Sequence, residues 1–102
     1  MIFTRFGDVE FSHAVAKVPK AGEFRVQQIH GGDYRRETPS DALYQTAREA
    51  LEALPVRWLY ARLDWLDWAT DPKLGEVEII EPHLYWDLAP ECADAFAEKL
   101  VR

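Results

Sequence analysis

The sequence predicts an α+β fold in which a mainly antiparallel sheet of about five strands packs with two helices. In several short segments between glycines and prolines, apolar residues alternate with polar ones, which is typical of strands joined in hairpins. Two other segments repeat apolar residues at helical spacing, and each follows a helix-start signal. The predicted order is strand, strand, strand, helix, strand, strand, helix. This order favours hairpins over the alternating strands and helices of a parallel sheet.

The N-terminal third is expected to form three strands. Residues 1–6 and 9–18 flank the turn Gly7-Asp8 and predict a β-hairpin. Residues 24–30, closed by Gly31-Gly32, predict a third strand. Strict alternation in the second strand places one set of side chains on a common face: Val9, Phe11, His13, Val15 and Lys17.

The first helix is expected to begin near Thr38, whose hydroxyl can cap it, with Pro39 at the first helical position and Asp41 three residues after the cap. Pro55 predicts its end. The apolar stripe of this helix consists of Leu43, Ala47, Ala50, Leu51 and Leu54.

The C-terminal half predicts a second hairpin and a second helix. Residues 57–66 and 75–80 predict two strands around a polar turn at 70–75, and residues 83–88 predict a loop. Pro90 is expected to start the last helix. Its inward-facing residues are predicted to be Ala93, Phe96, Ala97 and Leu100.

Length and composition limit the function classes. The 102 residues are expected to form a single domain, 1–102, and the 48% of apolar residues is enough for a folded core. The net charge of −6, with no basic run longer than Arg35-Arg36, argues against nucleic acid as a partner. A single cysteine, no secretion signal and no apolar run long enough for a membrane span predict a cytoplasmic protein without a membrane partner.

The negative charge is concentrated in the second predicted hairpin. The segment 64–81 contains six acidic residues and one basic residue, Lys73. It therefore carries a charge of −5 out of the net charge of −6. The acidic residues are Asp64, Asp67, Asp71, Glu76, Glu78 and Glu81.

Side chains two residues apart in a strand share a face, so Arg62 and Asp64 lie on one face, and so do Glu76 and Glu78. If the two faces coincide, three carboxylates converge, and carboxylate oxygens are the ligands that Mg²⁺ prefers. The alternative is a solvated acidic face without metal, which is common in half-buried hairpins and which the pattern alone favours. The opposite face would build the core from Ala61, Leu63, Trp65, Val77 and Ile79.

These residues carry a resemblance to a known family. Ala61-Arg62-Leu63-Asp64, followed after a polar turn by Glu76-Val77-Glu78-Ile79-Ile80-Glu81-Pro82, resembles the C-terminal signature of the ATP-grasp ligases, in the branch similar to prokaryotic glutathione synthetase. Upstream, residues 11–15, residues 22–27 and His30-Gly31-Gly32 resemble strand segments of that branch. The likeness covers nearly the whole chain, and the predicted fold resembles the C-terminal lobe of the ATP-grasp fold.

The resemblance implies an ATP-dependent ligase that activates a small-molecule carboxylate as an acyl phosphate and joins it to an amine. It implies Mg²⁺ ligands at Asp64, Glu76 and Glu78, the last of which is an asparagine in many members. It also implies that Arg25 and Arg62 are catalytic and, with Glu76, bind the nucleotide, since a guanidinium suits phosphate recognition.

The N-terminal domain and the central lobe of that family have no counterpart among these 102 residues. We therefore expect the C-terminal Mg²⁺-ATP-binding lobe of a carboxylate–amine ligase that is inactive alone: a fragment, a truncated gene product, or half of a site completed by another chain. A homodimer or a companion chain is the expected partner.

The alternative function is a non-catalytic α+β module that dimerises, or binds a protein partner, through its acidic hairpin and its aromatic residues. The three histidines share no metal-ligand spacing with one another or with Cys92, so no zinc site is predicted. Cys92 lies near acidic residues and is expected to be inert.

Overall fold

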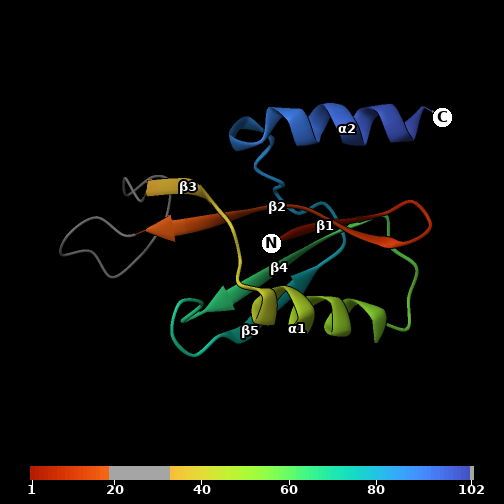
Figure 1. Ribbon diagram of the computed structural model, residues 1–102. Coiled ribbons are helices and arrows are strands. Elements are labelled where there is room, and N and C mark those ends of the chain that lie inside the picture. The colour runs from red at the N-terminus through yellow and green to blue at the C-terminus, as the bar shows by residue number, and fades with distance from the viewer. Residues whose placement is uncertain (19–32, 102) are drawn as a thin grey trace.

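The computed structural model describes residues 1–18 and 33–101. Within them the chain forms an α+β fold with an open, five-stranded antiparallel sheet in the order β3-β2-β1-β4-β5 and two α-helices, which confirms the predicted fold class (Figure 1). The elements are β1 Ile2–Arg5, β2 Val9–Val18, β3 Asp33–Glu37, α1 Asp41–Glu52, β4 Tyr60–Leu66, β5 Lys73–Glu78, the 3₁₀ helix η2 Trp86–Leu88 and α2 Pro90–Leu100.

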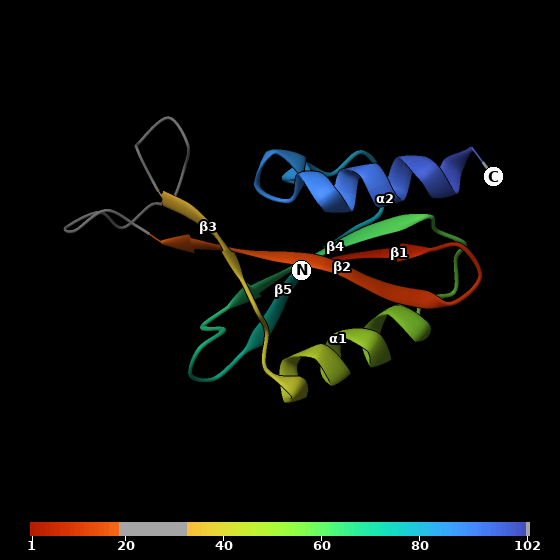
Figure 2. The same ribbon diagram turned by 45° about the horizontal axis from the view of Figure 1, so that its top comes forward.

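The two helices lie on opposite faces of the sheet, α1 below and α2 above in both ribbon views (Figures 1 and 2). On the α1 face, the stripe of Leu43, Ala47 and Leu51 is buried against strand residues. The predicted core set of the second hairpin packs there: Ala61, Leu63, Trp65 and Val77 of β4 and β5, and Ile79 just after β5. This face holds the main hydrophobic core.

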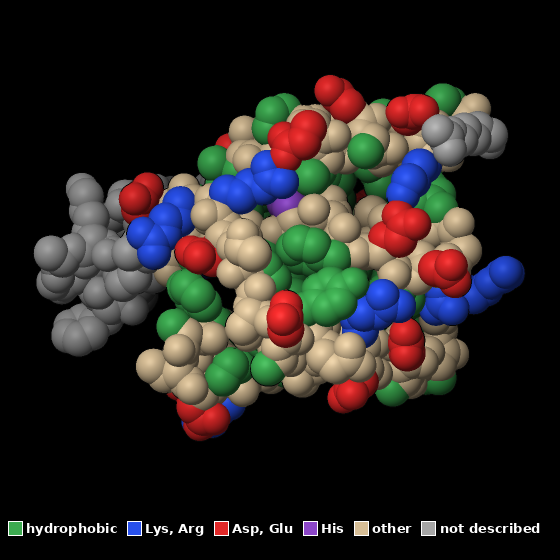
Figure 3. Space-filling model, viewed as in Figure 1, with side chains coloured by type: hydrophobic (Ala, Val, Ile, Leu, Met, Phe, Trp, Pro, Cys, Tyr) green, Lys and Arg blue, Asp and Glu red, His purple; other side chains and the backbone are tan. Residues whose placement is uncertain are grey.

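Helix α2 contacts the other face through Phe96 and through polar pairs, Glu91 with Arg36, Cys92 with Ser12 and Lys99 with Glu10. The ring of Phe96 packs against those of Phe6, Tyr60 and Trp86 at centroid distances of 5.5, 6.1 and 5.5 Å. The outer surface of α2 carries acidic side chains, while hydrophobic side chains gather in the middle of the same view, between the two helices (Figure 3). No residue of α2 is fully buried. Its attachment to the sheet therefore depends strongly on Phe96.

A β-bulge corrects the predicted alternation of β2. Phe3 pairs with Phe11 and Ile2 pairs with His13, which leaves Ser12 as an extra residue. Phe11 consequently packs on Phe3 on the α1 face, while the His13 ring packs on Trp86 on the opposite face. Strict alternation would have placed Phe11 and His13 together.

Other predicted elements need correction. Ser40 caps α1, not Thr38: its hydroxyl accepts a hydrogen bond from the backbone N–H of Leu43 at 3.2 Å, and Pro39 lies outside the helix. The strands predicted at 57–66 and 75–80 run instead from 60 to 66 and from 73 to 78.

Two further predictions concern the strand before α1 and the inward face of α2. The strand predicted at 24–30 lies outside the described residues, whereas β3, at Asp33–Glu37, was not predicted. In α2 the prediction holds for Ala93 and Phe96, which are half-buried, but Ala97 is exposed and the Leu100 side chain is 52% exposed. Among the described residues, no helix is long and apolar enough to cross a membrane.

Candidate functional site

The register between β4 and β5 brings the predicted charged residues together. Arg62 is the cross-strand partner of Glu78, and Asp64 is the partner of Glu76. The two faces of the hairpin therefore coincide, as the hypothesis of converging carboxylates required. Gly75 lies at a bulge, because Asp64 pairs with Glu76 while Trp65 pairs with Leu74. We call these four residues, Arg62, Asp64, Glu76 and Glu78, the charged cluster.

Arg62 lies at the centre of the charged cluster. Its Nε and Nη2 atoms donate to the two carboxylate oxygens of Asp64, both at 2.9 Å, in the bidentate geometry that gives strong pairs. Nη2 also lies 3.2 Å from Oε2 of Glu78, and Nη1 donates to the backbone oxygen of His83 at 3.2 Å. The Arg62 side chain is only 12% exposed, against 32% for each of the two carboxylates. One guanidinium thus fixes the geometry of two strands and the following loop.

The charged cluster carries more negative than positive charge. Burial lowers the pKa of Arg62, but hydrogen bonding to Asp64 and the charges of Asp64 and Glu78 outweigh burial and raise it overall. A hydrogen bond to Glu78 and its charge raise the pKa of Glu76 above the ordinary glutamate value. Three carboxylates against one guanidinium leave an excess of two negative charges, which matches the charge of Mg²⁺.

The charged cluster does not form a complete metal site alone. Among residues 1–18 and 33–101, no group of three or more potential ligands is arranged to hold a metal ion. Arg62 engages both carboxylate oxygens of Asp64 and the Oε2 atom of Glu78, which leaves the exposed Glu76 and the second oxygen of Glu78 as oxygen donors. Mg²⁺ is usually held by one or two carboxylates together with substrate phosphates and water, so two donors suffice in that setting.

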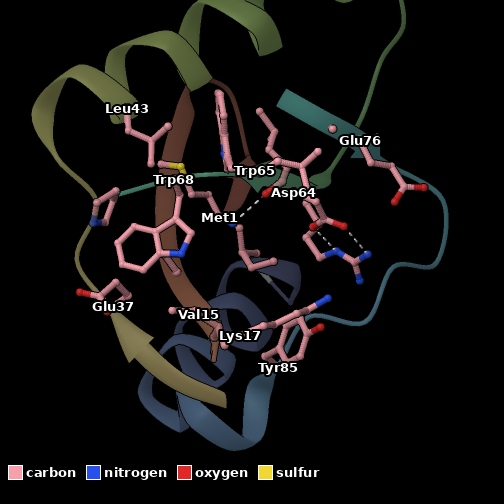
Figure 4. A pocket seen from close by; sticks show the side chains of 18 residues that line it. Met1, Val15, Lys17, Glu37, Leu43, Asp64, Trp65, Trp68, Glu76 and Tyr85 are labelled. Atoms are coloured by element: carbon pink, nitrogen blue, oxygen red, sulfur yellow. Dashed lines mark hydrogen bonds and ion pairs between the residues drawn. The ribbon is translucent and has the colours of Figure 1, made fainter. Parts of the chain in front are cut away.

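A cavity of about 470 Å³ adjoins the charged cluster (Figure 4). Met1 lies at its centre, with Leu43, Trp65 and Trp68 on one side and Asp64, Lys17 and Tyr85 on the other. The α-amino group of Met1 donates to the backbone oxygen of Leu63 at 2.9 Å, and burial lowers its pKa to about 6.

Sequence reasoning missed this cavity. The Tyr85 ring stacks on Tyr34 at 5.7 Å, and the ammonium of Lys17 lies near both rings. Tyr85 also has a left-handed backbone with φ of 55°, which is uncommon for a residue other than glycine. No local spacing connects positions 17, 34 and 85, so only the folded chain brings them together.

The remaining candidate residues from the sequence lie outside the described residues or have a structural role. Arg25, predicted to be catalytic, and His30-Gly31-Gly32 lie outside the described residues. His13 is buried, and burial lowers its pKa; its Nε2–H donates to the backbone oxygen of Leu84 at 2.7 Å, which describes a neutral structural imidazole.

The surroundings of Cys92 differ from those predicted. The Arg36 guanidinium lies 3.4 Å from its sulfur, although Arg36 also pairs with Glu91. Cys92 therefore has a positively charged neighbour besides the expected acidic ones, and its inertness stays a prediction.

Comparisons with known proteins identify no relative of this chain. No protein-family model, no curated protein and no solved structure matches this chain. What the residues can do chemically is thus the basis for the function.

Proposed function

We propose that this chain is the C-terminal Mg²⁺-ATP-binding lobe of an ATP-dependent carboxylate–amine ligase similar to the ATP-grasp family, and that it supplies one half of the nucleotide site. The observation that carries the proposal is the pairing of Arg62 with Glu78 and of Asp64 with Glu76 across β4 and β5. These four positions lie within two of the segments, 61–64 and 76–82, that carry the family resemblance of the sequence.

The chain's own residues would have distinct roles in such a site. Glu76 and Glu78 would hold the metal through carboxylate oxygens, while Asp64 would keep Arg62 in place through its bidentate pair. The guanidinium of Arg62 would neutralise charge on a phosphate bound near the cluster. When bound, Mg²⁺ would supply bridging of phosphate oxygens and charge neutralisation for phosphoryl transfer.

The excess negative charge supports a cation at this site. Glu76 and Glu78 repel each other in the free protein, as the raised pKa of Glu76 indicates. A divalent cation would offset this repulsion, and phosphate oxygens would complete its coordination. Because one lobe provides only part of the contacts, we expect millimolar affinity and no turnover by the isolated chain.

The test is thermal unfolding with 10 mM MgCl₂ and ATP, compared with either component alone. If the ligand is at several times its dissociation constant, binding stabilises the fold by about 1 kcal/mol, or roughly 4–8 °C. Glu76→Gln should abolish this shift while raising the melting temperature of the free protein, because it relieves repulsion without breaking a contact of Arg62.

Asp71→Asn is the matched control, because Asp71 lies in the same hairpin but pairs with Lys73 outside the charged cluster. This variant should keep the full shift with Mg²⁺ and ATP. Absence of a shift in the unsubstituted protein, or an undiminished shift in Glu76→Gln, would show that the cluster is a solvated acidic face.

A second candidate function is a dimerisation or protein-interaction module, and it is favoured by apolar side chains on the edge of the sheet. β5 is an edge strand, Leu74 within it is exposed, and Ile80, just beyond it, is 82% exposed. Exposed apolar side chains on an edge strand favour association.

Light scattering at 10–100 µM tests the association. A dimer that Leu74→Lys converts to a monomer would support the module. The nucleotide titration is independent of this result, since Leu74 lies outside the charged cluster.

A further inference from the structure

The outer edge of β5 faces away from the rest of the sheet. β5 lies at one end of the strand order and, in the part of the chain that the structure describes, pairs with β4 alone (Figure 1). The residues Lys73–Glu76 of this strand are exposed, and Leu74 keeps 41% of its surface exposed. An exposed edge strand with apolar side chains favours pairing with another strand.

The backbone groups that face this edge follow from the pairing of β4. The N–H of Leu63 donates to the carbonyl of Met1, and the Met1 amino group donates to the carbonyl of Leu63, so both groups of Leu63 face β1. Because this direction alternates along a strand, Trp65 also faces β1. Residues opposite each other in an antiparallel pair face each other or face apart. Val77 and Leu74, which lie opposite these two residues, therefore direct their N–H and C=O groups to the outer edge.

The bulge at Gly75 gives this edge an unusual spacing. Outward-facing residues of a regular strand are two positions apart, whereas Leu74 and Val77 are three apart. Two copies of β5 that pair antiparallel are related by a two-fold axis. If this axis passes between Gly75 and Glu76, Leu74 of each copy lies opposite Val77 of the other. Any other antiparallel register of β5 on itself leaves at least one of these two residues without an outward-facing partner in the strand.

The side chains fit the same register. Leu74 lies opposite Val77 of the second copy on the α1 face, where its cross-strand partner Trp65 packs on the core. Lys73 lies opposite Glu78 of the second copy on the other face, so opposite charges meet. Each of these pairs occurs twice in a symmetric dimer. A shift by three positions would instead set Glu76 opposite Glu78, which places like charges together.

The register also changes the charge around the charged cluster. Lys73 of each copy supplies one positive charge next to Glu78 of the other, which reduces the excess negative charge of both clusters. Glu76 lies opposite Gly75 of the second copy, and the absence of a side chain there leaves room for it. The two Glu76 side chains share a face and lie diagonally across the axis, so they repel each other.

We propose that a second copy of this chain binds to the outer edge of β5, so that the two sheets continue into each other across a two-fold axis between Gly75 and Glu76. Leu74 and Val77 of one copy exchange backbone hydrogen bonds with Val77 and Leu74 of the other. This inference rests on the second candidate function, dimerisation, and names its surface and its partner. It does not depend on nucleotide binding.

The experiment couples lysine to carboxylate side chains with a water-soluble carbodiimide at 100 µM of the 102-residue chain. Lys73 and Glu78 of one copy are about 16 Å apart along the strand, too far for a direct bond between their side chains. A Lys73–Glu78 cross-link, identified by mass spectrometry of the digested dimer, is therefore expected only between two copies. In a mixture of ¹⁵N-labelled and unlabelled chains, it should join one labelled and one unlabelled peptide.

Two substitutions of Leu74 test the backbone pairing. Leu74→Pro removes an N–H that faces away from β4, so the pairing of β4 with β5 should survive, as circular dichroism can verify. Leu74→Ala removes the same side chain but keeps this N–H. In a dilution series followed by light scattering, Leu74→Ala should weaken the dimer roughly tenfold, and Leu74→Pro by roughly a further tenfold or more. Glu76→Gln should strengthen the dimer, because it relieves the repulsion across the axis.

Three results would overturn the proposal. A monomer at 100 µM would also remove dimerisation from the second candidate function. A dimer with a Lys73–Glu81 cross-link in place of Lys73–Glu78, or with neither, would leave dimerisation standing but refute this register. Equal affinities of Leu74→Ala and Leu74→Pro would show that the outer backbone groups of β5 do not pair. The thermal shift with Mg²⁺ and ATP reports separately on the nucleotide site.

Discussion

Replacement of Arg62 by methionine should destabilise the fold more than loss of any surface ion pair. Methionine keeps the unbranched length of the side chain but removes a guanidinium that holds Asp64 at 2.9 Å through two bonds and Glu78 at 3.2 Å. Removing one partner of a buried ion pair costs about 3–5 kcal/mol because the other charges lose their compensation. Asp64 and Glu78 are each 32% exposed, so water compensates part of this loss. We therefore expect Arg62→Met to lower the free energy of unfolding by about 2–3 kcal/mol at pH 7.

The assay is urea unfolding followed by tryptophan fluorescence, with Arg48→Met as the control. Arg48 forms an exposed pair with Glu52 at 3.4 Å within α1, and its loss should cost about 0.5 kcal/mol or less. Arg62→Lys should give an intermediate loss, because lysine keeps the charge but not the bidentate geometry. A cost for Arg62→Met within 1 kcal/mol of the Arg48→Met value would refute the view that one guanidinium holds β4, β5 and the following loop together.

Three further predictions concern the buried amino group of Met1, the packing of α2 and the N-cap of α1. Burial lowers the pKa of the Met1 amino group from 8.0 to about 6, so the unfolded chain binds this proton at a higher pH than the folded chain does. The free energy of unfolding should therefore fall by about 2 kcal/mol between pH 8 and 6, and Nα-acetylation should abolish most of this dependence. Phe96→Ala should cost about 2 kcal/mol in urea unfolding because three aromatic contacts are lost, whereas Leu100→Ala, in the same helix but exposed, should change stability by less than about 0.5 kcal/mol; equal effects would contradict the role given to Phe96. Ser40→Ala should lower the free energy of unfolding by about 1 kcal/mol through loss of the helix cap, whereas Thr38→Ala should leave it nearly unchanged. The reverse order would support Thr38 as the cap, as predicted from the sequence.

Local spacing in the sequence determined the hairpins, the helices and the composition of the faces. Gly7, with φ of 117°, provides a turn that a side chain would strain, and the alternation around it predicts β1 and β2. Apolar residues at helical spacing predict α1, and a period of two places Arg62 with Asp64 and Glu76 with Glu78. Each of these features depends on neighbours within four positions, so a single sequence can reveal it.

Only the tertiary structure decided which of these local features meet. β3 is the polar segment DYRRE, and it becomes a strand through pairing with β2 along Ala14–Val18, which no local pattern announces. The bulge at Ser12 places Phe11 and His13 on opposite faces of the sheet, and the register of β4 on β5 sets Arg62 opposite Glu78. These outcomes depend on pairing between distant segments, and that pairing is fixed by the packing of the whole chain.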